Sequence, residues 1–285
     1  MNIMVTGGAG FVGTNLIKRL LKDGHNVVSL DNYSTGTEDN HQEGCKYVDA
    51  DIRDVVDFDY FMEDVDVVYH LAALARIQPS FKNPANTLEV GILGTMNILE
   101  WVKEKENKPR VIFAGSSSVH SGMMKNPYTF SKSVADDMCM LYKKHFGVNV
   151  SICRFYNVYG PHQLIEGEYC TVVGVFERQY KNQEPLTITG DGFQRRDFTH
   201  IDDIVDGLIL TSENEKCYDE IELGRGNNYS INELASMFET KTEYIDARPG
   251  EAKETLCDIS IAKRLIGYEP TINIEDYIED IVNGR

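Results

Sequence analysis

The chain has 285 residues, of which 42% are apolar and 26% are charged, and its formal net charge is −17. This length and composition are sufficient for a well-buried core in one large domain, or in one domain with a second unit about half its size. The negative charge argues against a nucleic acid or an anionic membrane as a partner, because phosphate groups repel such a surface.

Two absences narrow the class of protein further. No signal peptide precedes the first apolar segment, and no apolar run is long enough to cross a bilayer. The six cysteines form neither a CxxC pair nor a cluster with histidines that would suit a metal. We therefore expect a cytoplasmic protein with reduced thiols and no bound metal.

Short apolar runs alternate with longer amphipathic ones along the first half of the chain. The pattern predicts strands at 3–5, 27–30, 65–71, 110–114 and 150–153, and helices at 11–22, 87–106 and 129–146. This alternation is typical of an α/β fold, here a Rossmann-type doubly wound parallel sheet with helices on both faces. After Gly160-Pro161 the pattern becomes irregular, which predicts a smaller C-terminal lobe. We expect residues 1–158 and about 195–222 to form the larger unit, and about 159–194 and 223–285 to form the lobe.

A glycine loop follows the first predicted strand. In Thr6–Gly13 (TGGAGFVG), Gly7, Gly10 and Gly13 have GxxGxxG spacing. The first glycine permits a tight turn, the second lets the backbone approach a pyrophosphate, and the third lets the helix pack closely on the strand. The helix N-terminus then offers N–H groups and partial positive charge to the anion.

The second predicted strand ends in Asp31, 18 residues after Gly13. A carboxylate at this position accepts hydrogen bonds from a ribose 2′-hydroxyl and repels a 2′-phosphate. The strand, loop, helix, strand and carboxylate therefore predict that the chain binds NAD and not NADP.

Tyr128 and Lys132 have YxxxK spacing at the start of a predicted helix, so both side chains lie on one face. A free tyrosine has a pKa of about 10, and a neighbouring lysine cation favours its phenolate. Ser116 follows the strand at 110–114, and the carboxyl end of a parallel strand faces the ligand crevice. The order of these groups predicts that the cofactor is used chemically.

These segments resemble the extended short-chain dehydrogenase/reductases, in the NAD-dependent nucleotide-sugar epimerase/dehydratase family, over nearly the whole chain. The match at 31–36 is most similar to UDP-hexose 4-epimerases. The resemblance implies that Ser116, Tyr128 and Lys132 form the catalytic set. It implies cofactor contacts from Gly7, Gly10, Phe11, Val12, Gly13, Asp31, Asn32, Ser34, Thr35, Gly36, Asp51, Ile52, Leu71, Ala72, Ala73, Tyr128, Lys132 and Tyr156.

The resemblance also implies a nucleotide-sugar site. Asn157 lies in a segment similar to RxxNVYGP and is expected to contact the substrate, as are Ser116 and Ser117. Arg196, in GDG…RDFxxxDD, and Arg248, in RPGE, are expected to hold the substrate diphosphate, for which the geometry and permanent charge of arginine are suited.

Ser117 and Ser118 follow Ser116 where 4,6-dehydratases of this family carry Asp-Glu and decarboxylating relatives usually keep a Glu. A hydroxyl cannot replace a carboxyl group as acid or base. We therefore expect a 4-epimerase, in which Tyr128 takes the proton from the sugar 4-hydroxyl and the 4-keto sugar rotates before it is reduced again. Thr255 falls where a large tyrosine would exclude N-acetyl groups, which favours UDP-N-acetylglucosamine/UDP-N-acetylgalactosamine, with UDP-glucose/UDP-galactose also allowed.

Some positions depart from the family pattern. Only 12 positions separate Ser116 from Tyr128, about half the usual number, and His120 replaces a tyrosine. Gly91 stands where the family commonly has an asparagine, which lowers helix stability and removes a polar group near the site.

Other readings stay open: another nucleotide-sugar epimerase, a 4-keto reductase, a 4,6-dehydratase, or an NAD-binding scaffold without catalysis. Relatives dimerise through the YxxxK helix and the helix before it. Val134, Met138, Leu141 and Tyr142 form an apolar stripe on that helix, so a homodimer is expected.

Overall fold

The computed structural model describes residues 1–54, 60–62 and 64–284. A seven-stranded parallel sheet has the order β11-β6-β5-β4-β1-β2-β3. Its strands are β1 (Asn2–Thr6), β2 (Asn26–Asp31), β3 (Lys46–Asp49), β4 (Val67–His70), β5 (Arg110–Ser116), β6 (Val150–Phe155) and β11 (Glu220–Leu223). The α/β fold with a doubly wound parallel sheet is confirmed, and β3 and β11 are strands that the sequence pattern did not predict.

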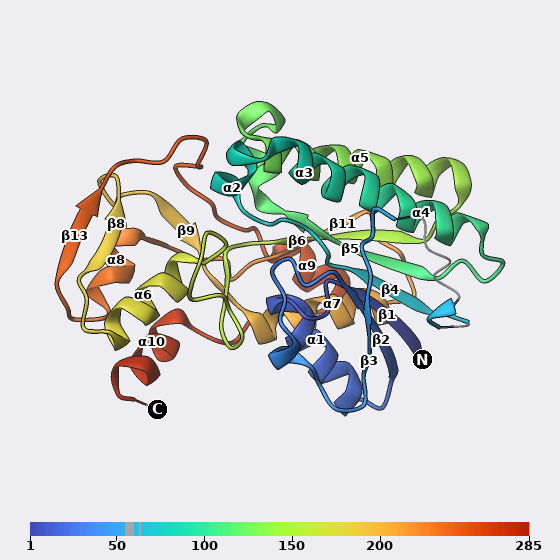
Figure 1. Cartoon of the computed structure of the whole chain (residues 1–285), viewed down its shortest axis with the longest axis horizontal. Helices are drawn as coiled ribbons and strands as arrows, with labels where there is room; N and C mark the ends of the chain where they lie inside the picture. The colour runs from blue at the N-terminus through green and yellow to red at the C-terminus, as the bar shows by residue number, and fades with distance from the viewer. Residues whose placement is uncertain (55–59, 63, 285) are drawn as a thin grey trace.

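Helices cover both faces of this sheet (Figure 1). One face packs against α2 (Ile77–Lys82), α3 (Pro84–Leu88), α4 (Thr95–Glu104) and α5 (Pro127–Phe146), and the other against α1 (Phe11–Lys22), α7 (Ile201–Glu213) and α9 (Ser260–Ile266). Along β1, Met4 belongs to the first core cluster, while Ile3 and Val5 belong to the second. This alternation is what a strand buried on both faces requires.

The C-terminal lobe contains small sheets and further helices. Its elements are β7 (Val158–Tyr159), α6 (Val172–Lys181), β8 (Leu186–Thr189), β9 (Arg195–Asp197), β10 (Thr199–His200), β12 (Asn228–Ser230), α8 (Ile231–Ser236), β13 (Thr242–Ile245) and α10 (Ile274–Val282). The pairs β10-β7, β12-β9 and β13-β8 form two-stranded sheets. Phe198 packs in the core cluster of this lobe, whereas Ala262 and Ile266 of α9 pack under the large sheet. The predicted division of the chain into two units remains a proposal.

The predicted helix at 87–106 is not regular. It is divided into α3, a π-helical stretch at Glu89–Gly94 and α4. A Cβ on Gly91 would lie 2.9 Å from Cβ and Oγ of Ser131, which stands between Tyr128 and Lys132 on α5. Gly91 thus lets this helix approach the segment that carries the YxxxK pair.

No helix among the described residues is both long and apolar enough to span a membrane. From β1 the chain adds β2 and β3 on one side and then returns to add β4 on the other, so the strand order reverses between β1 and β4. A doubly wound sheet opens its ligand crevice at such a point, at the carboxyl ends of the strands.

Candidate active site

One cleft runs along the carboxyl ends of β1, β2, β4, β5 and β6 into the C-terminal lobe. Most of the predicted site residues line it: Gly7, Gly10, Phe11, Val12, Gly13, Asp31, Asn32, Ser34, Thr35, Asp51, Ile52, Leu71, Ala72, Ala73, Ser116, Ser117, Tyr128, Asn157, Arg196, Arg248 and Thr255. Gly36, Lys132 and Tyr156 lie outside its wall. The cleft therefore brings together segments that are distant in sequence.

The glycine loop is built as a pyrophosphate site requires. A Cβ on Gly13 would lie 2.2 Å from the Gly7 carbonyl oxygen, whereas a Cβ on Gly10 would meet only that oxygen, at 3.4 Å. Gly10 is the N-cap residue of α1 and has no side chain that could cap the helix. The first N–H groups of α1 thus remain open to an anion, and the residues present fit an NAD pyrophosphate.

Asp31 ties the end of β2 to the glycine loop. Its Oδ2 accepts a hydrogen bond from Ala9 N at 2.9 Å, and its Oδ1 accepts one from Tyr33 N at 2.8 Å. Burial raises the pKa of Asp31, and these N–H groups oppose the rise. Each carboxylate oxygen keeps acceptor capacity, which a ribose hydroxyl can use.

Asp51 and Gly36, two further positions expected to contact the cofactor, have different surroundings. Asp51 accepts hydrogen bonds from Arg53 and from Asn32 Nδ2, and the Arg53 bonds hold the pKa of Asp51 well below its usual range. Gly36 packs on the loop itself, because a Cβ there would lie 2.9 Å from the backbone of Ala9. Gly36 therefore supports the backbone of the glycine loop at Ala9.

Tyr128 lies in the first turn of α5. Asn126 caps this helix by accepting a hydrogen bond from Thr129 N at 2.7 Å, and Pro127 occupies its first position. Burial raises the pKa of Tyr128 above its ordinary value, and a hydrogen bond with Ser116 and the charge of Arg76 oppose only part of this rise. The partial positive charge at the helix N-terminus also favours a phenolate.

Lys132 lies on α5, four residues after Tyr128, and its side chain is buried against β5. Its Nζ donates a hydrogen bond to the Ala114 carbonyl oxygen at 2.7 Å and lies 4.7 Å from the centre of the Phe113 ring. Burial lowers the pKa of Lys132 to about 8. In this structure Lys132 thus anchors α5 on β5, and the charges of Arg76 and Arg154 lower the pKa of Tyr128.

Predicted substrate residues also contact one another. Asn157 Nδ2 donates hydrogen bonds to Thr255 Oγ1 and to the Asp197 carbonyl oxygen, both at 3.0 Å. Arg196 Nη2 lies 3.5 Å from Glu251, and burial lowers the pKa of Arg196. Together with Arg248, these groups give the C-terminal lobe's side of the cleft amide, hydroxyl and guanidinium donors.

Two cleft residues, Phe155 and Arg76, and one supporting residue outside the cleft, Arg154, were not found from the sequence. Phe155 lines the cleft, whereas its neighbour Tyr156 is buried behind it. Arg76 stands at the N-cap of α2, where no motif marked it. Arg154 donates a hydrogen bond to the Ser116 carbonyl oxygen at 3.0 Å and lies 3.0 Å from Asp136, so it fixes the end of β5 against α5.

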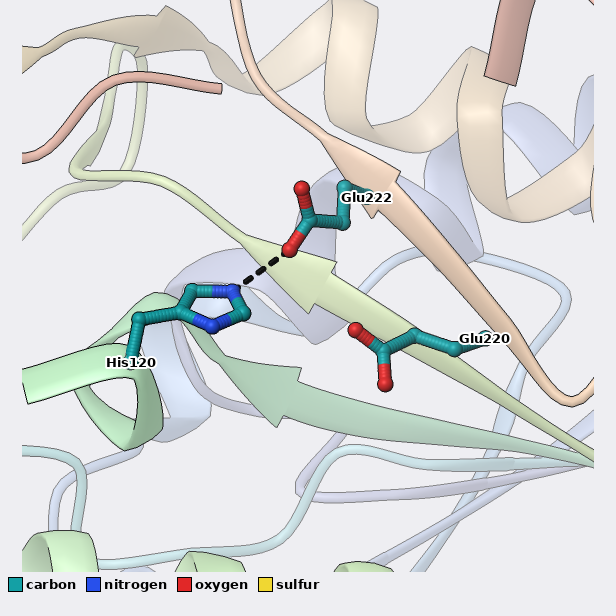
Figure 2. A group of neighbouring side chains, drawn as sticks. All are labelled: His120, Glu220 and Glu222. Atoms are coloured by element: carbon teal, nitrogen blue, oxygen red, sulfur yellow. Dashed lines mark hydrogen bonds and ion pairs between the residues drawn. The ribbon is translucent and has the colours of Figure 1, made fainter. Parts of the chain in front are cut away.

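The short segment between Ser116 and Tyr128 forms two 3₁₀ turns, at Ser117–Ser121 and Met123–Lys125. His120 Nε2 of the first turn donates a hydrogen bond to Glu222 Oε1 of β11 at 2.5 Å, and Glu220 lies beside them (Figure 2). The ligand atoms of these three residues lie within 4.8 Å of one another. Arg154, however, donates to both carboxylate oxygens of Glu220 at 2.8 and 2.7 Å, and its charge opposes a cation there. We interpret the group as an ion-pair network that fastens the turn after Ser116 to the sheet.

This network should make stability depend on pH. Glu222 raises the pKa of His120, so the ion pair is fully present below the ordinary histidine pKa and is lost as the pH rises through the raised value. Glu222→Gln is expected to lower the free energy of unfolding by up to about 1 kcal/mol at pH 6 and by less at pH 8 to 9, since the pair is half exposed. Thermal unfolding across this range measures the difference. Glu43→Gln, at an exposed position, is the control, and an equal loss for Glu222→Gln at every pH would contradict the interpretation.

Comparison with known proteins finds a family match and several similar proteins. Residues 3–224 match the model of the NAD dependent epimerase/dehydratase family. A relative from Methanocaldococcus jannaschii, provisionally described as a UDP-glucose 4-epimerase, is 33% identical and covers 99% of this chain and 97% of its own. The UDP-glucuronic acid 4-epimerase of Bacillus cereus, solved with UDP-glucuronic acid and NAD, is 31% identical over 100% of this chain and 99% of its own, with a TM-score of 0.90. The UDP-N-acetylglucosamine 4-epimerase of Methanobrevibacter ruminantium, solved with UDP-N-acetylmuramic acid, is 28% identical over 99% and 96%, with a TM-score of 0.88.

Proposed function

Because the chain belongs to the NAD-dependent epimerase/dehydratase family, we propose that it is a 4-epimerase that inverts C4 of a UDP-linked hexose. A 2-acetamido sugar is favoured, with UDP-N-acetylglucosamine and UDP-N-acetylgalactosamine as one pair and UDP-glucose and UDP-galactose as another. The observation that carries the proposal is the arrangement of Tyr128 and Ser116 in one cleft with Ser117 and Ser118, where no carboxyl group follows Ser116.

The residues of the cleft have distinct roles in this reaction. In the proposed reaction Tyr128, as phenolate, takes the proton of the sugar 4-hydroxyl and later returns it. Ser116, which is hydrogen-bonded to Tyr128, lies in the hydrogen-bond path. Lys132 holds α5, and with it Tyr128, against β5. Bound NAD supplies the chemistry of accepting a hydride from C4 and giving it back. Because the sequence places serines where dehydration would require carboxyl groups, oxidation followed by reduction is the course that these residues can support.

The binding residues act on both ends of the substrate. We propose that Arg196 and Arg248 hold the diphosphate and that Asn157 orients the sugar. The glycine loop and Asp31 hold the dinucleotide, and Asp31 selects the free 2′-hydroxyl of NAD. Of the apolar stripe expected at a dimer contact, Leu141 is exposed, whereas Tyr142 is buried in the core and Met138 packs against it. Met96 of α4 and Phe146 of α5 are also exposed, and we propose that these two helices pair two copies of the chain as a homodimer.

A panel of UDP-, GDP- and dTDP-sugars tests the reaction and its nucleotide. The NAD-loaded protein is incubated with each sugar, the products are separated by chromatography, and NADH is followed by absorbance. Interconversion of C4 epimers without net NADH is the expected result. Net NADH would indicate a dehydrogenase, and a product that has lost water or carbon dioxide would indicate a dehydratase or a decarboxylase.

The small side chain of Thr255 leads to a separate prediction about which sugar is preferred. Thr255→Tyr is expected to lower kcat/KM for UDP-N-acetylglucosamine relative to UDP-glucose by about tenfold or more, because the added ring fills the space for the acetamido group. The hydroxyl of Thr255 also accepts the Asn157 bond, so Thr255→Ser, which keeps this bond, is the control. An equal loss on both sugars in Thr255→Tyr would place the acetamido group elsewhere.

A further inference from the structure

Most of the segment at 248–253 lines the cleft, and its far end is joined to the C-terminal lobe. Glu251 lies 3.5 Å from Arg196 Nη2, and the Lys253 carbonyl oxygen accepts a hydrogen bond from the backbone of β9 at 2.9 Å. Arg248 is the first residue of the segment and lines the cleft. The segment therefore carries one of the two arginines that the proposed function assigns to the diphosphate and contacts the other.

The centre of this segment is held by α2, which covers the large sheet. The Pro249 carbonyl oxygen accepts a hydrogen bond from Gln78 Nε2 at 2.9 Å. Gly250 packs against Phe81, because a Cβ there would lie 3.0 Å from the ring, and its φ of +76° also favours glycine. A hydrogen bond and a close contact thus fasten the segment to α2.

Asn126 connects the same segment to the first turn of α5. Its Nδ2 donates a hydrogen bond to the Gly250 carbonyl oxygen at 3.2 Å, while its Oδ1 accepts one from Thr129 N at 2.7 Å and so caps the helix. These partners fix the orientation of the amide, because a carbonyl needs the NH₂ group and an N–H needs the oxygen. Asn126 is only 5% exposed. One buried side chain therefore links the segment to the turn that holds Tyr128.

We propose that Asn126 is a positioning residue that couples binding of the substrate diphosphate to catalysis. This inference rests on the proposed function, because it takes Arg248 as a diphosphate ligand and Tyr128 as the acid–base group. A diphosphate held by Arg248 fixes the segment at 248–253, and the Asn126 amide then fixes the first turn of α5. Binding energy from the nucleotide end of the substrate thus contributes to placing Tyr128 at the sugar.

Asn126→Ser separates the two contacts of this side chain. Serine is neutral and caps a helix as well as asparagine does, but its hydroxyl is one bond too short to replace the amide contact with Gly250. The NAD-loaded variant is compared with Arg248→Gln and with the double variant in kcat and KM for UDP-N-acetylglucosamine and UDP-glucose. Each single variant is expected to lower kcat by about tenfold, and the double variant no further, because both act through one contact. Arg248→Gln should raise KM in either background.

Hydrogen exchange gives a measurement that does not depend on turnover. UDP has the diphosphate without the sugar, and calorimetry establishes the concentration at which it saturates the NAD-loaded protein. Bound UDP is expected to slow amide exchange at 128–131 in the wild type but not in Asn126→Ser. Asn83→Ser is the matched control, because Asn83 caps α3 in the same way outside the cleft. It should leave both kcat and this protection unchanged.

Two results overturn the inference. One is a kcat of the double variant that equals the product of the two separate losses. The other is exchange at 128–131 that UDP leaves unchanged in the wild type, or slows equally in Asn126→Ser. If thermal unfolding shows that Asn126→Ser does not fold, Gln78→Ala, which removes the other hydrogen bond to the segment, takes its place in both measurements. If the wild type turns over no sugar, the proposed function fails, and exchange with UDP still decides the role of Asn126.

Discussion

Tyr128→Phe is expected to lower kcat for 4-epimerisation by about 100- to 10,000-fold, the usual contribution of a general acid–base group. The substitution removes the hydroxyl that takes the proton from the sugar and leaves the ring in place. The fixed position of Tyr128 in the capped first turn of α5 does not depend on this hydroxyl. Thermal stability and NAD content should therefore stay close to those of the wild type, while turnover is lost.

Tyr244→Phe serves as the control for this variant. Tyr244 is an exposed residue of β13, outside the cleft, and loses the same atom. Its turnover should equal that of the wild type. If Tyr128→Phe kept near-normal turnover with an intact fold, Tyr128 would not be the acid–base group and the catalytic assignment would fail.

The second prediction concerns the glycine loop, where Gly13→Ala and Gly10→Ala are expected to differ in their effects on stability. In Gly13→Ala the new Cβ would lie 2.2 Å from the Gly7 carbonyl oxygen and 2.6 Å from Gly8 Cα, and backbone atoms cannot move away as a side chain can. We expect a loss of about 1–3 kcal/mol in the free energy of unfolding, as for overpacking elsewhere, together with loss of NAD binding.

In Gly10→Ala the protein itself has room, because the Cβ meets only one atom, at 3.4 Å, and φ is −84°. The methyl group would instead occupy the space through which the pyrophosphate approaches α1. We expect a change below about 1 kcal/mol in stability but a fall of about tenfold or more in NAD affinity.

NAD titration and thermal unfolding, measured on the same samples, separate the two effects. Gly207→Ala is the control for destabilisation alone, because Gly207 lies on α7 and its Cβ would press on Leu223, away from the cleft. It should lose stability and keep its NAD affinity. Wild-type NAD affinity in Gly10→Ala would mean that the pyrophosphate lies elsewhere.

The parts of the site that follow from local sterics could be predicted from the sequence. Gly7, Gly10 and Gly13 mark the loop because each position excludes or limits a Cβ, and that demand is visible in residue type and spacing. Asp31 follows in the same way from its place at the end of a strand. The central strands and α5 could be predicted because buried strands and amphipathic helices have different apolar periods.

The remaining parts depend on tertiary packing. Phe155 and Tyr156 are adjacent aromatic residues, and only the position of β6 decides that Phe155 faces the cleft. Lys132 has the expected spacing, but its ammonium is bound to the Ala114 carbonyl oxygen of a different element. Arg76 belongs to no recognised pattern, and only the fold shows that it lines the cleft. Gly91 lowers the helix propensity of its segment, but a side chain there would not fit against Ser131.

The central claim is that the hydrogen at C4 leaves and returns without reaching solvent. The most direct measurement is the mass and NMR spectrum of the product formed from a UDP-sugar in D₂O by the NAD-loaded protein. We expect a C4 epimer with no deuterium on any ring carbon, because the 4-hydroxyl proton that Tyr128 takes and returns exchanges with solvent but the C4 hydride does not. Deuterium at C3 or C5, or a product that has lost water or carbon dioxide, would contradict it.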